Sequence, residues 1–169
     1  MKRSRTSVNK AGHPRASRPD IPGYGIVGEY EGRGLLPWSW ARQRLERGWN
    51  YWLVTVRPGG RPHMMPVWGV WWQDAFWFST GDKTVKARNL AANPRCVVAP
   101  DNFREAVVLE GAAEWVAASD SLQPLWAAYK KKYKWEVKGS GFFAVRPRTA
   151  FGLIEKGKLF TKTATRWRF

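Results

Sequence analysis

Apolar and polar residues alternate through most of this chain in short runs that are typical of β-strands, and helical spacing interrupts them three times. Strands are predicted over residues 51–57, 61–72, 75–80, 95–100, 105–116, 142–155 and 158–161. Helices are predicted over residues 38–48, 84–93 and 119–135. Many strands with few short helices predict a mainly β protein, an antiparallel barrel with peripheral helices.

Proline and glycine set the expected boundaries of these elements. Residues 58–60, Pro-Gly-Gly, predict a hairpin turn. Pro62 and Pro66 remove backbone donors from the following strand, so that strand must lie at a sheet edge or carry a bulge. Ser39 is the expected N-cap of the first helix, which should end at Gly48.

The first residues differ in composition from the rest of the chain. Residues 1–20 are rich in Arg, Lys, Ser and Pro and lack apolar periodicity, which predicts a flexible basic tail. Residues 21–37 are dense in Gly and Pro and predict an irregular arm over the surface. Residues 21–169 are expected to form a single domain, since neither a repeat nor an interdomain linker is evident.

Charge narrows the possible partners. The formal net charge of +16 favours an anionic partner, which includes nucleic acid, acidic lipid and polyanionic small molecules. Nucleic acid is disfavoured because no recognised motif is present and much of the basic charge lies in the tail. No run is long and apolar enough to span a bilayer, and no secretory signal is visible. The single cysteine, Cys96, excludes an intrachain disulfide, so cytoplasm is the expected location.

A cluster of hydroxyls and lysines marks the candidate site. It follows two aromatic strands and opens the second helix, and its members are Ser79, Thr80, Lys83, Thr84 and Lys86. Hydroxyls, exposed backbone N–H groups and ammonium charges at a helix N-terminus are the donors that a phosphate prefers. The neighbouring aromatic strands could hold the attached ring, so the segment predicts a phosphorylated aromatic cofactor.

Other chemistries find less support. His63 is the only histidine outside the tail, and it is either structural or a proton donor near neutral pH. Two histidines and one cysteine provide no recognisable metal-ligand cluster, so no metal is expected. No motif places a Ser-His-Asp triad, and no catalytic side chain is assigned. Residues 130–134, KKKYK, are expected to be a solvated helix end that could attract a polyanion.

These motifs together resemble a known family. The order is RPHMMPVWGVW, then FWFSTGDKTVKARNLAANPR, then VVLEGAAEWV, with TRWRF at the end. This order resembles the pyridoxamine 5′-phosphate oxidase-like split-barrel flavoproteins, and more narrowly their flavin/deazaflavin oxidoreductase branch. The resemblance covers residues 35–116 best and the last strands less closely.

The resemblance implies roles for particular residues. Ser79, Thr80 and Lys86 would hold the cofactor phosphate, with Lys83 and Thr84 beside them. The strand segment Met65, Pro66, Val67 and Trp68 would lie beneath the isoalloxazine ring and donate backbone hydrogen bonds to it. The family is usually a homodimer with the cofactor at the interface, and Arg166 and Trp167 are the expected contacts from the partner side. The C-terminus differs from that of the oxidase proper, which argues against pyridoxamine phosphate as substrate.

The implied function is an oxidoreductase that binds coenzyme F-420 and transfers a hydride to a small organic acceptor. A basic groove suits F-420, whose glutamate chain adds carboxylates to its phosphodiester. FMN is the alternative cofactor, and a cofactor-binding protein without turnover is the alternative function. The sequence does not identify the substrate.

Overall fold

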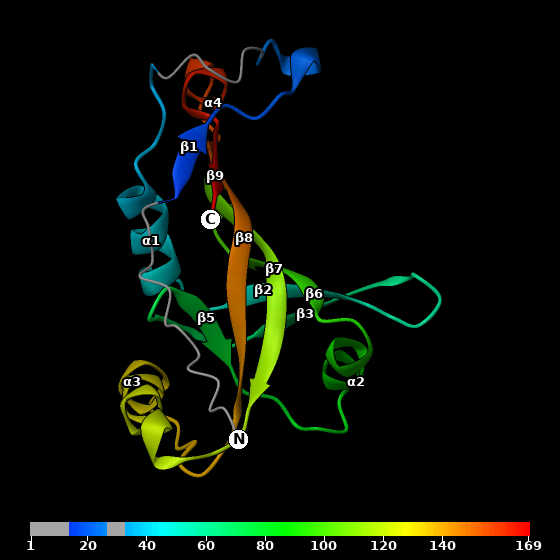
Figure 1. Cartoon of the computed structure of the whole chain (residues 1–169). Helices are drawn as coiled ribbons and strands as arrows, with labels where there is room; N and C mark the ends of the chain where they lie inside the picture. Colours follow the sequence, from blue (N-terminus) through cyan, green and yellow to red (C-terminus); the bar gives the residue numbers. More distant parts are fainter. Residues whose placement is uncertain (1–13, 27–32) are drawn as a thin grey trace, which may run out of the picture.

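The strands dominate the computed structural model, which describes residues 14–26 and 33–169 (Figure 1). Nine strands within these ranges belong to one antiparallel sheet, with the order β1-β9-β8-β7-β6-β2-β3, and β5 joins it by pairing with both β4 and β8. The strands are β1 (Arg15–Ser17), β2 (Tyr51–Val56), β3 (Pro62–Val67), β4 (Val70–Trp72), β5 (Ala75–Phe78), β6 (Arg95–Pro100), β7 (Glu105–Val116), β8 (Phe142–Ile154) and β9 (Thr165–Arg168).

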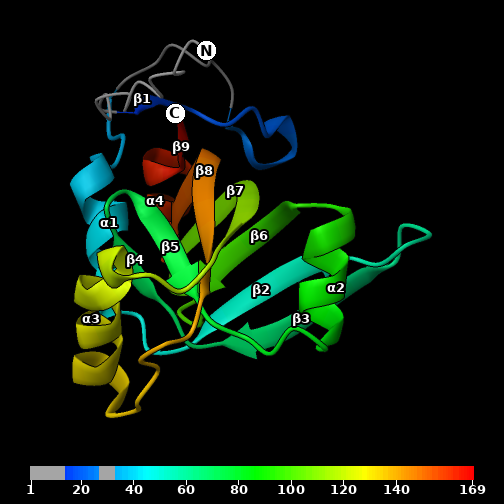
Figure 2. The same cartoon turned by 60° about the horizontal axis from the view of Figure 1, so that its bottom comes forward.

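The helices lie around this sheet, as Figures 1 and 2 show. They are α1 (Trp38–Arg47), α2 (Val85–Ala92), α3 (Gln123–Tyr133) and α4 (Lys158–Thr163), and two single 3-10 turns are η1 (Pro22–Tyr24) and η2 (Asp120–Leu122). The mainly β architecture with peripheral helices is therefore confirmed.

Strands β7 and β8 are the two longest of the described strands and form the central pair of the sheet. They pair along almost their whole length, and a register shift between Glu110 and Gly111 bends the ladder. The first part of β8 also pairs with β5 and its second part with β9, so β8 closes the sheet on itself. The enclosed core contains Leu53, Phe76, Leu109 and Trp167, with Leu45 of α1. Burial of these large apolar side chains stabilises the barrel.

A second core lies between α3 and the small β4–β5 hairpin. Leu125, Trp126, Tyr129 and Tyr133 of α3 pack there against residues that include Trp77 of β5. These α3 residues follow helical spacing, so the apolar face of the helix is buried in this contact. The packing places the C-terminal end of α3 beside the loop between β3 and β4.

Most predicted boundaries agree with the structure, and three do not. Strands β6 and β7 begin and end where the sequence predicts them. Residues 61–72 do not form one strand, because the ladder breaks between Val67 and Val70. Residues 158–161 were expected to form a strand but begin α4, and Pro37 rather than Ser39 occupies the N-cap position of α1.

The expected tail is also shorter than predicted. Residues 1–13 lie outside the described ranges, but Arg15–Ser17 pair with Arg166–Arg168 as strand β1. The buried Arg18 side chain then donates to the carbonyls of Thr161, Ala164 and Arg33. These contacts correct the prediction of a flexible tail for residues 14–20, since backbone pairing and a buried guanidinium fix the segment.

Candidate functional site

The start of α2 collects the hydroxyls that the sequence predicts as phosphate ligands. Thr84 is the N-cap, and its Oγ1 accepts from the Ala87 N–H (3.3 Å) and donates to the Gly81 carbonyl (2.8 Å). The Thr80 hydroxyl lies 3.2 Å from the Thr84 hydroxyl. Thr84 satisfies one of the first N–H groups of the helix, and those of Val85 and Lys86 have no intrahelical partner. This arrangement leaves donors at a positive helix end.

The remaining cluster members are placed differently from one another. Lys86 is half-buried on the first turn of α2. Lys83 is exposed, and its carbonyl accepts from the Arg88 side chain (2.8 Å). The Ser79 hydroxyl donates to the Gly141 carbonyl (3.1 Å), so its proton is used within the protein. The structure therefore brings Thr80 and Thr84 together at the start of α2, whereas Ser79 faces a neighbouring loop, and the place of Lys86 beside a phosphate stays a prediction.

Strand β3 lies at the end of the sheet, as its prolines predict. The Arg57 N–H donates to the Arg61 carbonyl, and antiparallel pairs alternate, so the β2 pairs of Pro62, Met64 and Pro66 are not hydrogen-bonded. The backbone N–H and C=O of Met64 consequently point to the free edge.

This alternation corrects the predicted backbone donors to the ring. Met65 and Val67 are directed toward β2, where they face Leu53 and Tyr51, and Pro66 has no N–H. The donor that β3 offers along its free edge is Met64. Side-chain contact of Met65 or Trp68 with a ring stays a prediction, and both residues are exposed, by 43% and 38%.

A buried polar contact connects α2 to the hairpin of β2 and β3. The Asn89 side chain donates to Thr55 Oγ1 (2.9 Å), and Thr55 lies opposite His63 in the ladder. Asn89 is three residues after Lys86, so the two share a helix face and Lys86 lies on the side of α2 that meets the hairpin. His63 Nδ1 is buried without a hydrogen-bond partner in the described part of the chain.

These groups fit a phosphorylated ligand. A pair of hydroxyls, free N–H groups at a helix start and one ammonium group match the acceptor oxygens of a phosphate. A buried histidine nitrogen without a partner indicates a polar group that a ligand could satisfy. We call Thr80, Thr84 and Lys86 the α2 cradle.

The C-terminal end of β3 is held by side chains of α3 that are not among the predicted site residues. The Tyr129 hydroxyl donates to the Trp68 carbonyl (3.2 Å), and the Gly69 N–H donates to the Tyr133 hydroxyl (2.8 Å). Gly69 has no space for a side chain, since a Cβ would lie 2.2 Å from Phe76 Cζ. The spacing of Tyr129 and Tyr133, one helical turn apart, is the signal that could have shown this contact.

Lys132 of α3 also contacts this end of β3. Its ammonium donates to Tyr51 Oη (2.8 Å) and to the Gly69 carbonyl (2.9 Å), and it lies over the rings of Tyr51 and Tyr133. Burial lowers the pKa of Lys132 to about 8. Burial also raises the pKa of Tyr133 to about 12, against a smaller opposing effect of its hydrogen bond with Gly69.

The C-terminal strand contradicts one of its two predicted contacts, and the other stays a prediction. Trp167 is fully buried in the barrel core, opposite Ala150 and edge-on to Trp38, so it cannot contact a partner subunit. This is a correction, and its cause is the β8–β9 pairing that turns the indole inward. Arg166 is half-buried and its Nε donates to Ser17 Oγ (3.2 Å); its role toward a cofactor stays a prediction.

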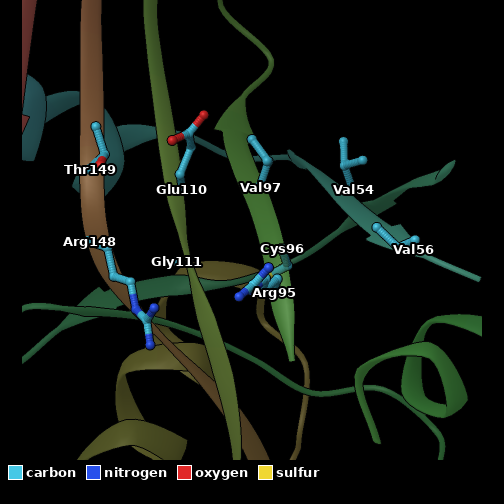
Figure 3. A pocket seen from close by; sticks show the side chains of 9 residues that line it. All are labelled: Val54, Val56, Arg95, Cys96, Val97, Glu110, Gly111, Arg148 and Thr149. Atoms are coloured by element: carbon cyan, nitrogen blue, oxygen red, sulfur yellow. The ribbon is translucent and has the colours of Figure 1, made fainter. Parts of the chain in front are cut away.

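The face of the sheet that points away from the core carries a cavity of about 350 Å³ (Figure 3). Val54, Val97, Glu110 and Thr149 line it in one cross-strand row. Figure 3 shows Arg95 and Arg148 on the same side of this row, with Gly111 between them. We call this surface the outer sheet face.

Three further observations limit other chemistries. Cys96 is buried, and burial raises the pKa of its thiol to about 12, which keeps it unreactive at neutral pH. Within residues 14–26 and 33–169, no three His, Cys, Asp or Glu residues lie close enough to hold a metal ion. None of the helices in these ranges has the length and apolarity needed to cross a membrane.

The chain was also compared with known protein families and solved structures, and a family model that includes the candidate site matches it. The family model described as pyridoxamine 5′-phosphate oxidase matches residues 41–156, which include the α2 cradle and all of β2 to β8. No curated protein matches the chain.

Solved structures with the same fold bind different groups. An F-420 reductase is 25% identical, covers 64% of this chain and 94% of its own, and has a TM-score of 0.53. A pyridoxamine 5′-phosphate oxidase-related, FMN-binding protein from Nostoc punctiforme is 17% identical, with coverages of 70% and 80% and a TM-score of 0.51. A heme storage protein from Vibrio cholerae is 18% identical, with coverages of 63% and 84% and a TM-score of 0.52. The predicted split barrel is thereby confirmed.

Proposed function

This chain belongs to the pyridoxamine 5′-phosphate oxidase family, and on that premise we propose that it is an oxidoreductase that binds coenzyme F-420. The observation that carries the proposal is the α2 cradle, where two threonine hydroxyls lie 3.2 Å apart at the start of a helix whose first turn carries Lys86. The cradle would hold the cofactor phosphate, and β3 would support the ring.

The choice of F-420 over FMN rests on charge and on one neighbour. A net charge of +16 favours a cofactor with several carboxylates over one with a single phosphate. The F-420 reductase is also the most similar in sequence of the solved structures described above, at 25% identity. FMN is the second candidate, because the cradle itself recognises only the phosphate that both cofactors carry.

When bound, the deazaflavin ring supplies the carbon that exchanges a hydride with an organic acceptor. The chain supplies orientation: Met64 N–H at the free edge of β3 is directed to donate to the ring or its substituents. His63 Nδ1 is available to share a proton with a bound polar group. The exposed Met65 and Trp68 side chains would shield the ring from water.

Parallel titration of the cofactor-free protein with F-420 and FMN tests the proposal. We expect F-420 to bind more tightly, and Lys86→Ala to weaken binding of either cofactor by about tenfold to a hundredfold, the effect of one charge-assisted hydrogen bond. Lys162→Ala is the matched control, since this lysine is exposed on α4, and it should change the affinity less than twofold.

Each outcome of the titration tests a different part of the proposal. Unchanged affinity in Lys86→Ala would overturn the α2 cradle. Tighter binding of FMN would overturn the choice of F-420 but keep the phosphate site. Binding of F-420 without reduction of any acceptor in a broad screen would support the alternative function, a cofactor-binding protein without turnover.

We further propose a homodimer formed through the outer sheet face. Apolar side chains of this face, among them Trp52 and Met64, are 40% and 51% exposed in the single chain. Exposed large apolar side chains beside charged residues such as Glu110 and Arg148 are typical of an interface. Light scattering should give the mass of a dimer for the unmodified chain and of a monomer for Val97→Asp. A monomeric unmodified chain would refute the dimer.

A further inference from the structure

Three tryptophans gather around one buried tyrosine at the C-terminal end of β3. The Trp68 ring stacks on Tyr133 with a centroid distance of 4.8 Å and an interplanar angle of 6°. Trp135 meets Trp68 edge-on at 6.4 Å, and Trp49 meets Tyr133 edge-on at 5.0 Å. We call Trp49, Trp68 and Trp135 the tryptophan corner.

The corner is exposed and also rigid. Its three indoles are 51%, 38% and 61% exposed, in the order of their numbers, although Tyr133 between them is buried. The carbonyls of Trp49 and Trp68 accept from the hydroxyls of Tyr133 (2.8 Å) and Tyr129 (3.2 Å). Single exposed apolar residues are ordinary, but here two indoles pack on one buried ring and the third packs on Trp68, so the three form a patch. Because the backbone is already fixed, a ligand that stacks here orders little.

Lysines lie close to these rings in the sequence and in the structure. The ammonium of Lys132 lies over the Tyr133 ring and uses two of its three N–H groups, on Tyr51 and the Gly69 carbonyl. Lys130 is paired with Glu136 at 2.7 Å. In the described part of the chain, Lys131, Lys132 and Lys134 have no carboxylate within 4 Å. Stacking surfaces beside unpaired cations select planar anions.

The position of the corner links it to the proposed redox site. Trp68 follows directly on β3, the strand that is proposed to support the cofactor ring. We propose that the tryptophan corner binds the acceptor, and that this acceptor is a planar conjugated molecule with an anionic group. The assignment to an acceptor rests on the proposed function; the binding of planar anions does not.

The test measures binding without cofactor, by fluorescence of 8-anilinonaphthalene-1-sulfonate, an anion that carries a planar naphthalene ring, and of its uncharged analogue N-phenyl-1-naphthylamine. We expect Trp68→Leu to weaken both probes about tenfold. Lys132→Met should weaken only the sulfonate, by about fivefold or more. Trp135→Leu, a substitution at an exposed position that should not disturb folding, is expected to weaken both probes about threefold.

Trp115→Leu is the matched control. Trp115 is 51% exposed on β7 and lines a separate apolar cavity of about 390 Å³ beside α2, so it reports on probe bound elsewhere. The proposal requires this variant to bind within twofold of the unmodified chain. Equal losses in Trp115→Leu and Trp68→Leu, or no loss in Trp68→Leu and Trp135→Leu, would overturn it.

Two further outcomes identify the ligand. If oligothymidylate displaced the sulfonate more effectively than mononucleotides did, the corner would be a nucleic-acid site and the acceptor assignment would be wrong. F-420 titration of the same variants separates the two proposals, because Trp135→Leu should keep cofactor affinity within twofold. Sulfonate binding at the corner without F-420 binding to the unmodified chain would refute the proposed function alone.

Discussion

The two ends of strand β3 differ in how their polar groups are used. At one end, the α2 cradle has two hydroxyls that bond to each other and to nearby backbone groups, N–H groups without an intrahelical partner and a half-buried lysine, and His63 Nδ1 of β3 has no partner in the described part of the chain. At the other end, both backbone groups of Gly69 are bonded to side chains of α3. Uncommitted donors at a surface indicate a ligand site, whereas satisfied buried donors indicate structure. Substitutions at the two ends should therefore separate binding from stability.

The largest contrast is expected between two glycines. Gly69→Ala would place a Cβ 2.2 Å from Phe76 Cζ and 2.7 Å from the Trp77 carbonyl, both in the packed interior. We expect a loss of about 3 kcal/mol or more in the free energy of unfolding. Gly81→Ala, in the loop of the α2 cradle, meets only Thr84 Cγ2 at 3.7 Å and should cost less than about 1 kcal/mol. Urea denaturation measures both.

A pair of hydroxyl deletions tests the same contrast at intermediate size. Tyr133→Phe removes the acceptor of the buried Gly69 N–H, which should lower the free energy of unfolding by about 2 kcal/mol and leave cofactor affinity unchanged. Thr80→Val should have the reverse effect, with a change in stability below about 1 kcal/mol and a severalfold loss of cofactor affinity. If both variants changed stability alone, the α2 cradle would be a structural hydrogen bond.

The smallest expected effect is a pH dependence of stability that belongs to the α3 end. Burial lowers the pKa of Lys132 from 10.5 to about 8, so between these values the unfolded chain binds more protons and the free energy of unfolding rises with pH. Burial raises the pKa values of Tyr51, Tyr129 and Tyr133 above their usual 10, so stability should fall again above pH 10. Thermal unfolding between pH 7 and 11 should show this maximum.

Lys132→Met provides the control for that profile. The rise between pH 8 and 10 should disappear in this variant, while the fall above pH 10 should persist because the tyrosines remain. A rise of the same size in Lys132→Met would assign the effect to another group.

The predictions from sequence succeeded where local pattern decides the outcome. Alternation located β6 and β7, and the helix expected from Thr84 agrees with α2, of which Thr84 is the N-cap. The pairing of residues far apart was not visible. Trp167 looked like a surface residue in an arginine-rich end, and only its place opposite Ala150 puts the indole in the core.

Two further differences between the prediction and the structure also arise from contacts between residues far apart in the sequence. Residues 158–161 were predicted as a strand, but the described fold uses them in α4, which packs on β8. The α3 side of β3 was overlooked because Lys132 was read as part of a solvated lysine run. Its ammonium in fact lies under the Gly69 carbonyl, a contact between residues 63 positions apart.

The pairing of β1 with β9 has a consequence for the order in which this sheet can be completed. Arg15–Ser17 leave the ribosome before every other described strand, yet their partner Arg166–Arg168 is synthesised after all of them. Closing a loop of this length costs more entropy than forming the nearby hairpins, so the early strand gains its hydrogen bonds only once the barrel exists. Strand β1 is therefore made first and paired last. Until β9 is synthesised, its unpaired backbone N–H and C=O groups can form hydrogen bonds with strands of other chains.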